Sequence, residues 1–309
     1  MTDDALMRLA LALQASSHAF TTVTPATHAR VNARTENAWA RNVEDVFGWS
    51  RPFRMGVLPQ PLFSALRDVG LLQQHHDGWL ARVRASTLRG CLFLHSAYPT
   101  TDRDAVFFGP DTYRFANAIA RQLSTDAVVR RAVDIGCGAG PGAVVVALER
   151  PDAEVVAVDI NATALQYTAV NAKVAGAARV VTCNSNLLDG VDGSFDLIVA
   201  NPPYLLDAHE RRYRHGGGSL GEGLSIAIAM LAGQRLAPGG TLLLYTGTAI
   251  VGGIDQLRAA VAPLLDASGL VWDYQEVDPD VFGEELSEPA YAHADRIAAV
   301  VLTARKAAA

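Results

Sequence analysis

The chain from about residue 130 onward alternates short apolar runs with stretches of helical periodicity. The runs are rich in Val, Ile and Leu and bounded by Gly, Pro and Asp, which is typical of strands buried on both faces. Such strands are predicted at Ala132–Ile135, Glu154–Ile160, Arg179–Cys183, Phe195–Ala200 and Gly240–Tyr245. Helices are predicted between them at Gly142–Arg150, Ala162–Ala175, Leu220–Leu236 and Ile254–Ser268. Because strand and helix alternate, the pattern indicates a parallel sheet with helices on both faces.

Two further strands are predicted near the end of the chain, with no helix between them. Val271–Val277 and Arg296–Thr303 are joined by an acidic loop, so we expect them to pair in antiparallel fashion at one edge of the sheet. The predicted fold class is therefore α/β, with a seven-stranded, mostly parallel, Rossmann-like sheet that carries helices on both faces.

Residues 1 to about 105 have a different pattern, in which amphipathic helical stretches mix with loops. Helices are predicted at Leu6–Ser16, Arg34–Val46 and Gln60–Leu72, and two alternating segments follow at Trp79–Ala85 and Gly90–Tyr98. Helices followed by a hairpin have the outline of a winged-helix module. We therefore expect two domains, a helical, winged-helix-like domain over residues 1–105 and an α/β domain over residues 106–309.

Composition and charge narrow the class of protein. The 309 residues are half apolar, yet no run of about 18 apolar residues occurs, so a membrane span is not expected. The three cysteines lack the spacing of a disulfide framework or a metal site, which favours a cytoplasmic protein without a metal. Residues 1–105 carry 11 Arg and 9 Asp or Glu, a net charge of +2. Because the whole chain has a net charge of −6, residues 106–309 carry −8. An acidic α/β body argues against strong non-specific binding of nucleic acid.

A glycine-rich loop joins the first predicted strand to its helix. It reads Asp134-Ile-Gly-Cys-Gly-Ala-Gly-Pro-Gly142, and its glycines at 136, 138 and 140 allow a tight turn and the close approach of a ligand. The helix that follows offers free N–H groups to an anion. Asp159 ends the next strand, where a carboxylate can accept hydrogen bonds from ribose hydroxyls. Both S-adenosylmethionine and a dinucleotide fit this loop, because it also satisfies the dinucleotide fingerprint.

A second motif, Asn201-Pro-Pro-Tyr204, directly follows the fourth predicted strand and so lies at the carboxyl edge of the sheet. A planar amide or exocyclic amine is a poor nucleophile because its lone pair is delocalised. The side-chain oxygen of Asn201 and the carbonyl oxygen of Pro202 can accept its two N–H groups and stabilise the charge that develops on nitrogen. The prolines stiffen the loop, and Tyr204 offers a face on which a planar group can stack.

These motifs together resemble those of class I S-adenosylmethionine-dependent methyltransferases, and more narrowly the N-P-P-Y group that modifies glutamine amides or the exocyclic amines of bases. The similarity covers about residues 105–305. It implies S-adenosylmethionine as the cofactor, direct transfer of the methyl group to nitrogen, and catalytic roles for Asn201, Pro202 and Tyr204. The cofactor-binding residues that it implies are Asp134, Gly136, Cys137, Gly138, Gly140, Asp159, Ile160, Asn186, Leu187 and Asn201.

A segment before the glycine loop is similar to one particular branch of this group. Phe107-Phe-Gly-Pro-Asp-Thr112 resembles the P-R-P-E/D-T segment that helps to shape the substrate pocket of the HemK/PrmC release-factor glutamine methyltransferases. Gly109 stands where arginine is usual, and ordinary capping of the following helix is the alternative explanation. The resemblance implies that Asp111, Thr112 and Pro203 contact the substrate.

Two polar stretches have weaker interpretations. Ser185–Leu188 is similar to the S-D-x-F stretch that contacts adenine in the same family, with Asn186 in place of the acid. Arg211-Arg-Tyr-Arg-His215 follows the N-P-P-Y motif and could contact phosphates or an acidic peptide, although a solvated loop is the simpler interpretation.

The expected function is N-methylation of a planar amide or exocyclic amino nitrogen, with a protein glutamine of the release-factor type as the main expectation. A base of ribosomal or transfer RNA, at guanine N2 or adenine N6, is the alternative, because residues 82–98 do not match the hairpin of the glutamine methyltransferases. The expected partner is thus a protein or an RNA. An NAD-dependent oxidoreductase is the alternative of another class, although no His or Tyr–Lys pair supplies a general acid for hydride transfer.

Overall fold

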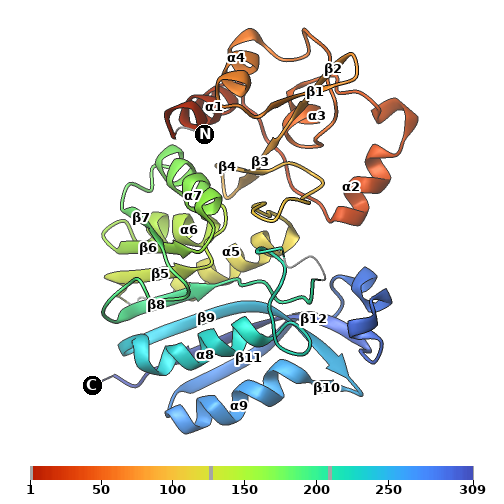
Figure 1. The fold of residues 1–309 in the computed structure, drawn as a ribbon. Helices are drawn as coiled ribbons and strands as arrows, with labels where there is room; N and C mark the ends of the chain where they lie inside the picture. Colours follow the sequence, from red (N-terminus) through yellow and green to blue (C-terminus); the bar gives the residue numbers. More distant parts are fainter. Residues whose placement is uncertain (1–2, 125–127, 208–210, 309) are drawn as a thin grey trace.

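The computed structural model describes residues 3–124, 128–207 and 211–308. Its centre is a sheet with the strand order β7-β6-β5-β8-β9-β12-β11, shown in Figure 1. The strands are β5 (Arg131–Ile135), β6 (Glu154–Asp159), β7 (Val180–Asn184), β8 (Phe195–Ala200), β9 (Leu236–Val251), β11 (Val271–Asp278) and β12 (Arg296–Arg305). A short β10 (Ile254–Asp255) turns back onto β9.

The pairing within this sheet confirms the predicted fold class. Neighbouring strands from β7 to β9 are parallel, whereas β12 is antiparallel to both β9 and β11. The last two strands therefore form the expected antiparallel pair, with β11 at the edge of the sheet. The strand β7 is also an edge strand, and the expectation that it is buried on both faces is wrong, because Val181 is exposed.

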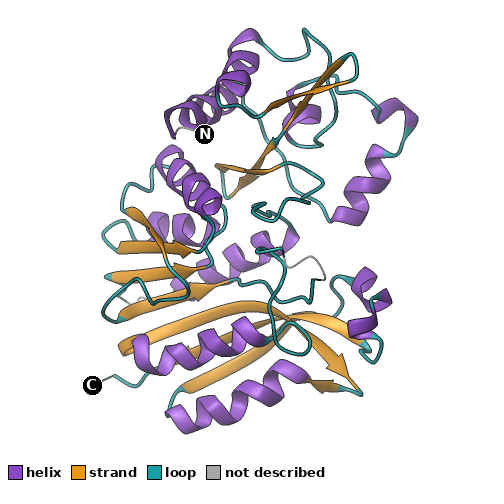
Figure 2. Ribbon diagram, viewed as in Figure 1, coloured by secondary structure: helices purple, strands orange, loops and turns teal. Residues whose placement is uncertain are grey.

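Helices cover both faces of the sheet (Figure 2). They are α5 (Pro110–Leu123), α6 (Pro141–Glu149) and α7 (Ala162–Val174) on one face, and α8 (Gly223–Arg235) and α9 (Gln256–Ser268) on the other. Successive strand residues point to opposite faces, as the pleat requires. Val155 packs into the cluster that includes α5, α6 and α7, and Val156 packs into the cluster that includes α8 and α9.

The N-terminal region differs most from the sequence prediction. Its elements are α1 (Asp3–Ala15), α2 (Pro25–Asn32), η1 (Thr35–Asn37), α3 (Val43–Phe47), α4 (Gln60–Asp68), β1 (Leu72–His75), β2 (Gly78–Ala81), β3 (Val83–Leu88) and β4 (Cys91–Ser96). The predicted helix over residues 34–46 is wrong, because Asn42 has extended backbone and caps the short α3 by accepting from the amide of Asp45. The single predicted hairpin is two hairpins, since β2 pairs with β1 and β3 pairs with β4.

One side chain joins this N-terminal region to the α/β body. Asn171 of α7 accepts a hydrogen bond from the amide of Leu94 in β4 (2.8 Å) and donates to the carbonyl oxygen of the same residue (2.9 Å). It also donates to the carbonyl oxygen of Ala139 in the glycine loop (2.9 Å). The division at residue 105 stays a prediction, because one buried apolar cluster runs from α1 through to α7.

Among the described residues, no helix combines the length and the apolar character needed to cross a membrane.

Candidate functional site

The glycine loop begins where β5 ends and turns directly into α6. Gly136, Gly138 and Gly140 all have a positive backbone φ, a conformation that residues other than glycine rarely adopt. Open space lies where a Cβ would stand at Gly136 and Gly138, so these two leave room for a ligand. At Gly140 a Cβ would lie 2.9 Å from Cγ2 of Thr168, so this glycine serves the packing of the loop on α7.

Asp159 lies at the end of β6 and closes one side of the loop. Its carboxylate accepts hydrogen bonds from the amide of Gly138 (3.0 Å) and from the amide of Asn161 (2.9 Å). Burial raises the pKa of this carboxyl group. The carboxylate is thus held in place against the glycine loop, at the position that the sequence predicts for an acceptor of ribose hydroxyls.

Asp134 lies beneath the same loop, at the end of β5. Its Oδ2 accepts from the amide of Ala143 in α6 (2.8 Å), whereas its buried Oδ1 accepts no hydrogen bond from residues 3–124, 128–207 or 211–308. Burial raises the pKa of this carboxyl group to about 7. A ligand with a positively charged donor would satisfy Oδ1 and favour the ionised form.

The Asn201–Tyr204 motif follows β8, beside β5 in the sheet, and therefore faces the glycine loop. The side-chain Oδ1 of Asn201 is buried and has no hydrogen-bond partner in the part of the chain that the structure describes. A buried acceptor without a donor costs about 1–3 kcal/mol, so a donor from a ligand would be stabilised here.

Tyr204 is oriented differently from what the sequence suggests. Its side chain is buried, and its hydroxyl donates to Oδ2 of Asp111, whose Oδ1 accepts from Tyr245 (2.7 Å). Arg114 also donates to Oδ1 of Asp111 (3.0 Å). Asp111 thereby fixes the start of α5 against the N-P-P-Y loop, and its neighbour Thr112 caps this helix by accepting from the amide of Gly109 (3.2 Å).

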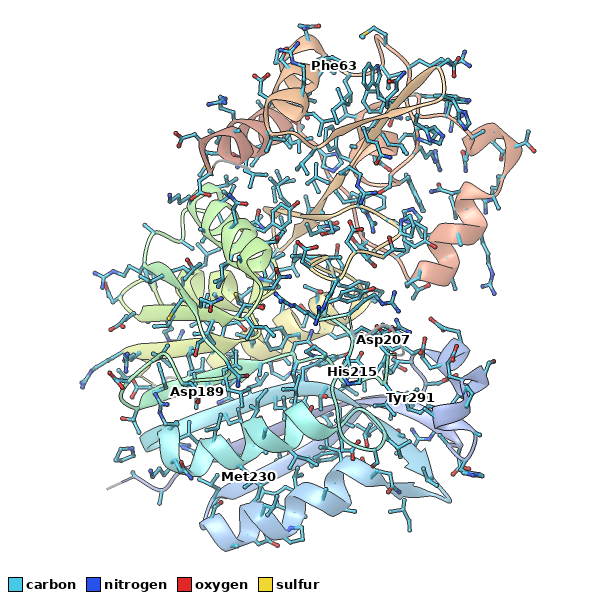
Figure 3. The ribbon with its side chains drawn as sticks, viewed as in Figure 1. Phe63, Asp189, Asp207, His215, Met230 and Tyr291 are labelled. Atoms are coloured by element: carbon cyan, nitrogen blue, oxygen red, sulfur yellow. The ribbon has the colours of Figure 1, made fainter. Side chains whose placement is uncertain are left out.

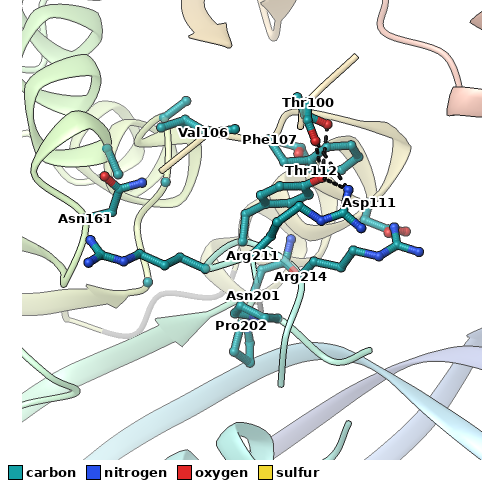
Figure 4. A pocket seen from close by; sticks show the side chains of 18 of the residues that line it. Thr100, Val106, Phe107, Asp111, Thr112, Asn161, Asn201, Pro202, Arg211 and Arg214 are labelled. Atoms are coloured by element: carbon teal, nitrogen blue, oxygen red, sulfur yellow. Dashed lines mark hydrogen bonds between the residues drawn. The ribbon is translucent and has the colours of Figure 1, made fainter. Parts of the chain in front are cut away.

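These groups surround a cavity of about 280 Å³ at the carboxyl edge of the sheet (Figure 4). Most of the residues predicted from the sequence line it, namely Asp111, Thr112, Asp134, Gly136, Cys137, Gly138, Asp159, Asn201, Pro202, Pro203 and Tyr204. Gly140, Ile160, Asn186 and Leu187 do not line it. Ile160 is half exposed and Asn186 is exposed, so their roles toward a cofactor stay predictions.

The cavity also has lining residues that the sequence prediction missed. Thr100 comes from the segment after β4, Phe107 precedes α5, and Tyr213 comes from the loop after the N-P-P-Y motif. Phe107 lies in the segment already singled out by Pro110–Thr112, so its neighbourhood was a usable signal. Tyr213 lies in the stretch 211–215, which the sequence had singled out for possible contacts with phosphates or an acidic peptide. Thr100 gave no signal, because only the tertiary fold brings it to the cavity.

The basic stretch 211–215 is a part of this wall, and the expectation of a solvated loop is wrong for two of its arginines. Arg211 donates from Nε to Asp207 (2.9 Å), and Arg214 pairs with Glu285. Figure 3 shows Asp207 and His215 side by side, and the amide of Asp207 donates to Nδ1 of His215 (3.2 Å). Hydrogen bonds from Arg211 lower the pKa of Asp207 to about 2. These pairs compensate the charges of Arg211 and Arg214 beside the cavity.

Within the described parts of the chain, no group of three or more His, Cys, Asp or Glu side chains is arranged to hold a metal ion.

The family model and the following curated relatives that match this chain are all methyltransferases. The family model "Methyltransferase small domain" matches residues 105–249. The "Release factor glutamine methyltransferase" of Xylella fastidiosa is 39% identical over 163 residues, which are 49% of this chain and 57% of that protein. The protein of the same name from Bordetella pertussis is 35% identical, over 60% of this chain and 70% of its own length.

A relative with a different name shows the same similarity. The "Ribosomal protein uL3 glutamine methyltransferase" of Neisseria gonorrhoeae is 34% identical over 40% of this chain and 46% of its own length. The chain thus spans only about half the length of several of the curated relatives that it matches. Among solved structures, Trm5b from Pyrococcus abyssi aligns with a TM-score of 0.50 and 15% identity, over 76% of this chain and 62% of that chain, which shows a shared fold alone.

Proposed function

Since the chain belongs to the class I S-adenosylmethionine-dependent methyltransferases of the HemK/PrmC-like group, we propose that it methylates the side-chain amide nitrogen of a glutamine in a protein. The observation that supports this most directly is that Asn201 lines the cavity together with the glycine loop, and that its buried Oδ1 has no hydrogen-bond partner among the described residues. An N–H₂ group is the donor that this acceptor lacks.

The cofactor half of the cavity fits S-adenosylmethionine. The buried Oδ1 of Asp134 lacks a donor, which the amino group of the cofactor would provide. The open space above Gly136 and Gly138 admits a ligand against the backbone, and Asp159 lies where ribose hydroxyls would be held. When bound, S-adenosylmethionine would supply the methyl group and leave as the neutral thioether, and the methylated nitrogen would release one proton to solvent.

The residues of this chain would act by orientation and by charge stabilisation. Asn201 Oδ1 and the carbonyl oxygen of Pro202 would accept the two N–H groups of the amide and hold its nitrogen toward the methyl group. Both acceptors favour the positive charge that develops on nitrogen during transfer. Tyr204 would act indirectly, because its hydroxyl holds Asp111 and thereby fixes the loop on α5.

The names of the relatives favour glutamine as the acceptor. Proteins named as methyltransferases of release-factor glutamine and of ribosomal protein uL3 glutamine are similar to 49% and 40% of this chain, respectively. The relatives named here are all methyltransferases, so the oxidoreductase alternative has no support among them. We further propose that residues 1–105 recognise the protein substrate and that the enzyme acts in the cytoplasm, where translation factors are found.

The acceptor can be identified with labelled cofactor. The full chain is incubated with S-adenosylmethionine carrying a radioactive methyl group and with cell extract, and the product is treated separately with protease and with RNase. We expect protease alone to release the label in small fragments, and peptide mass spectrometry to place one methyl group on a glutamine. Release by RNase alone would contradict the proposal and identify an RNA base as the acceptor.

A further inference from the structure

We propose that Phe107 and Tyr213 form the wall against which the planar acceptor group lies, so that this aromatic pair sets which side chain is methylated. The inference rests on the proposed function and adds to it the residues that contact and select the acceptor side chain. It also assigns the stacking surface to Phe107 and Tyr213 in place of Tyr204, where the sequence placed it.

The two rings lie nearly parallel, with their centroids 5.6 Å apart and their planes inclined by 11°. Both are half-buried, and both line the cavity that contains Asn201. Phe107 precedes α5, whereas Tyr213 belongs to the loop after the motif, so the pair closes the cavity from two separate segments. Figure 4 shows Phe107 close to Thr112, on the side of the cavity across from Asn161.

Tyr213 is held in this position by its hydroxyl. The hydroxyl donates to the carbonyl oxygen of Thr100 (2.8 Å) and accepts from a guanidinium nitrogen of Arg211 (3.3 Å). Arg211 is itself held by both carboxylate oxygens of Asp207. The ring is therefore fixed before a substrate arrives, which reduces the entropy that binding would otherwise cost.

Gly109 explains why this wall is particular to the present chain. A Cβ at Gly109 would lie only 2.5 Å from Cζ of Phe107, so a side chain at position 109 and this placement of the Phe107 ring exclude each other. The related P-R-P-E/D-T segment has arginine at the equivalent position. The glycine is thus matched to the aromatic ring that occupies the space.

Tyr204 is a poor stacking surface by comparison. Its hydroxyl is bound to Asp111, and its ring contacts Phe282 edge-on with centroids 5.8 Å apart. A Cβ at Gly247 would lie 2.3 Å from its Cδ2, so the backbone of β9 packs closely against the ring. Two of the three arginines that flank Tyr213 on this wall, Arg211 and Arg214, have their charges compensated by Asp207 and Glu285. An uncharged, flat amide suits such a surface.

The test separates substrate affinity from cofactor affinity. Phe107→Ala and Tyr213→Ala are compared with the wild-type chain for methylation of a glutamine peptide taken from a release factor, and cofactor binding is measured by calorimetry. We expect each substitution to raise KM for the peptide about tenfold, with kcat and the Kd of S-adenosylmethionine changed less than about threefold. Phe63→Ala, which removes an aromatic ring far from the cavity, should leave KM unchanged.

A second pair of variants tests the placement of the ring without any substrate. Gly109→Arg should lower the melting temperature, and Gly109→Arg combined with Phe107→Ala should recover part of the loss, because the clash is removed. If the wild-type enzyme is active and KM is unchanged in both alanine variants, the proposal that Phe107 and Tyr213 contact the acceptor is contradicted, whereas the proposed function is not. A wild-type chain that leaves every glutamine peptide unmethylated would instead contradict the proposed function.

Discussion

Asp134 and Asn201 both line one cavity, and each has a buried side-chain oxygen that accepts no hydrogen bond from the described residues. Such oxygens are costly in a folded protein unless a ligand satisfies them. Asp134 is the one whose charge can change near neutral pH, because burial raises its pKa to about 7. Its protonation state should therefore be linked both to folding and to cofactor binding.

The linkage has a definite sign. The folded state holds a proton on Asp134 that the unfolded state, with a pKa of 3.8, releases. The contribution of this residue to the free energy of unfolding should therefore fall as the pH rises from about 4 to about 7. A cationic cofactor prefers the ionised carboxylate, so its affinity should rise with pH over the last part of this range.

We expect the association constant of S-adenosylmethionine to increase as the pH rises from about 5.5 to 7.5, by up to about tenfold for each pH unit below the pKa. Titration calorimetry in buffers of different ionisation enthalpy measures both this constant and the released proton. In Asp134→Asn the increase and the proton release should disappear. A flat profile in the wild-type chain would show that Asp134 is already ionised or does not face the cofactor.

At the scale of elements, α7 connects the hairpin of β3 and β4 to the glycine loop through Asn171. Asn171→Leu would leave the amide and carbonyl of Leu94 and the carbonyl of Ala139 without partners. We expect the free energy of unfolding to fall by about 2–4 kcal/mol and cofactor affinity to weaken, because Ala139 lines the cavity. Urea unfolding and calorimetry provide the two readouts.

The matched control for this change is Asn117→Leu, at an exposed position of α5. It should change neither quantity measurably. If Asn171→Leu lowers stability without weakening cofactor binding, then the contact of α7 with the β3–β4 hairpin stabilises the fold but does not position the glycine loop.

Elements that are defined by an apolar pattern could be predicted from the sequence, whereas elements that depend on a helix cap could not. The strand β8 begins and ends where the pattern places it, because its residues are apolar except for Asp196 and it is bounded by the polar Ser194 and Asn201. The helix predicted over residues 34–46 failed because the cap at Asn42 outweighed the periodicity on either side of it. The missed α2 begins at Pro25 after a Thr24 cap, a start signal that its weak apolar periodicity concealed.

At the scale of the whole molecule, the cavity combines contiguous motifs with residues that only the fold brings together. Asp134–Gly140 and Asn201–Tyr204 could be located from the sequence, since each motif carries its chemistry within a few residues. The contacts that join Phe107, Tyr213 and Thr100 could not be located, because they span more than one hundred positions, although Phe107 and Tyr213 each lie in a stretch that the sequence had singled out. The same holds for the bond between Tyr204 and Asp111, which turns an expected stacking residue into a support for α5.

The continuous apolar cluster leads to a prediction for unfolding. Leu6 and Leu9 of α1 belong to the same buried cluster as Tyr167 and Val170 of α7. We therefore expect the chain to unfold in one cooperative transition, with equal calorimetric and van't Hoff enthalpies. Two separated transitions in differential scanning calorimetry would show that residues 1–105 fold independently of the α/β body.

The central claim is that Asn201 Oδ1 accepts an N–H of the group that becomes methylated. Single-turnover methyl transfer to a glutamine peptide, with cofactor and peptide both saturating, tests it most directly in Asn201→Ala. We predict a rate about 10²–10³-fold below that of the wild-type chain, while Asn117→Ala keeps the wild-type rate. A wild-type rate in Asn201→Ala would contradict the account.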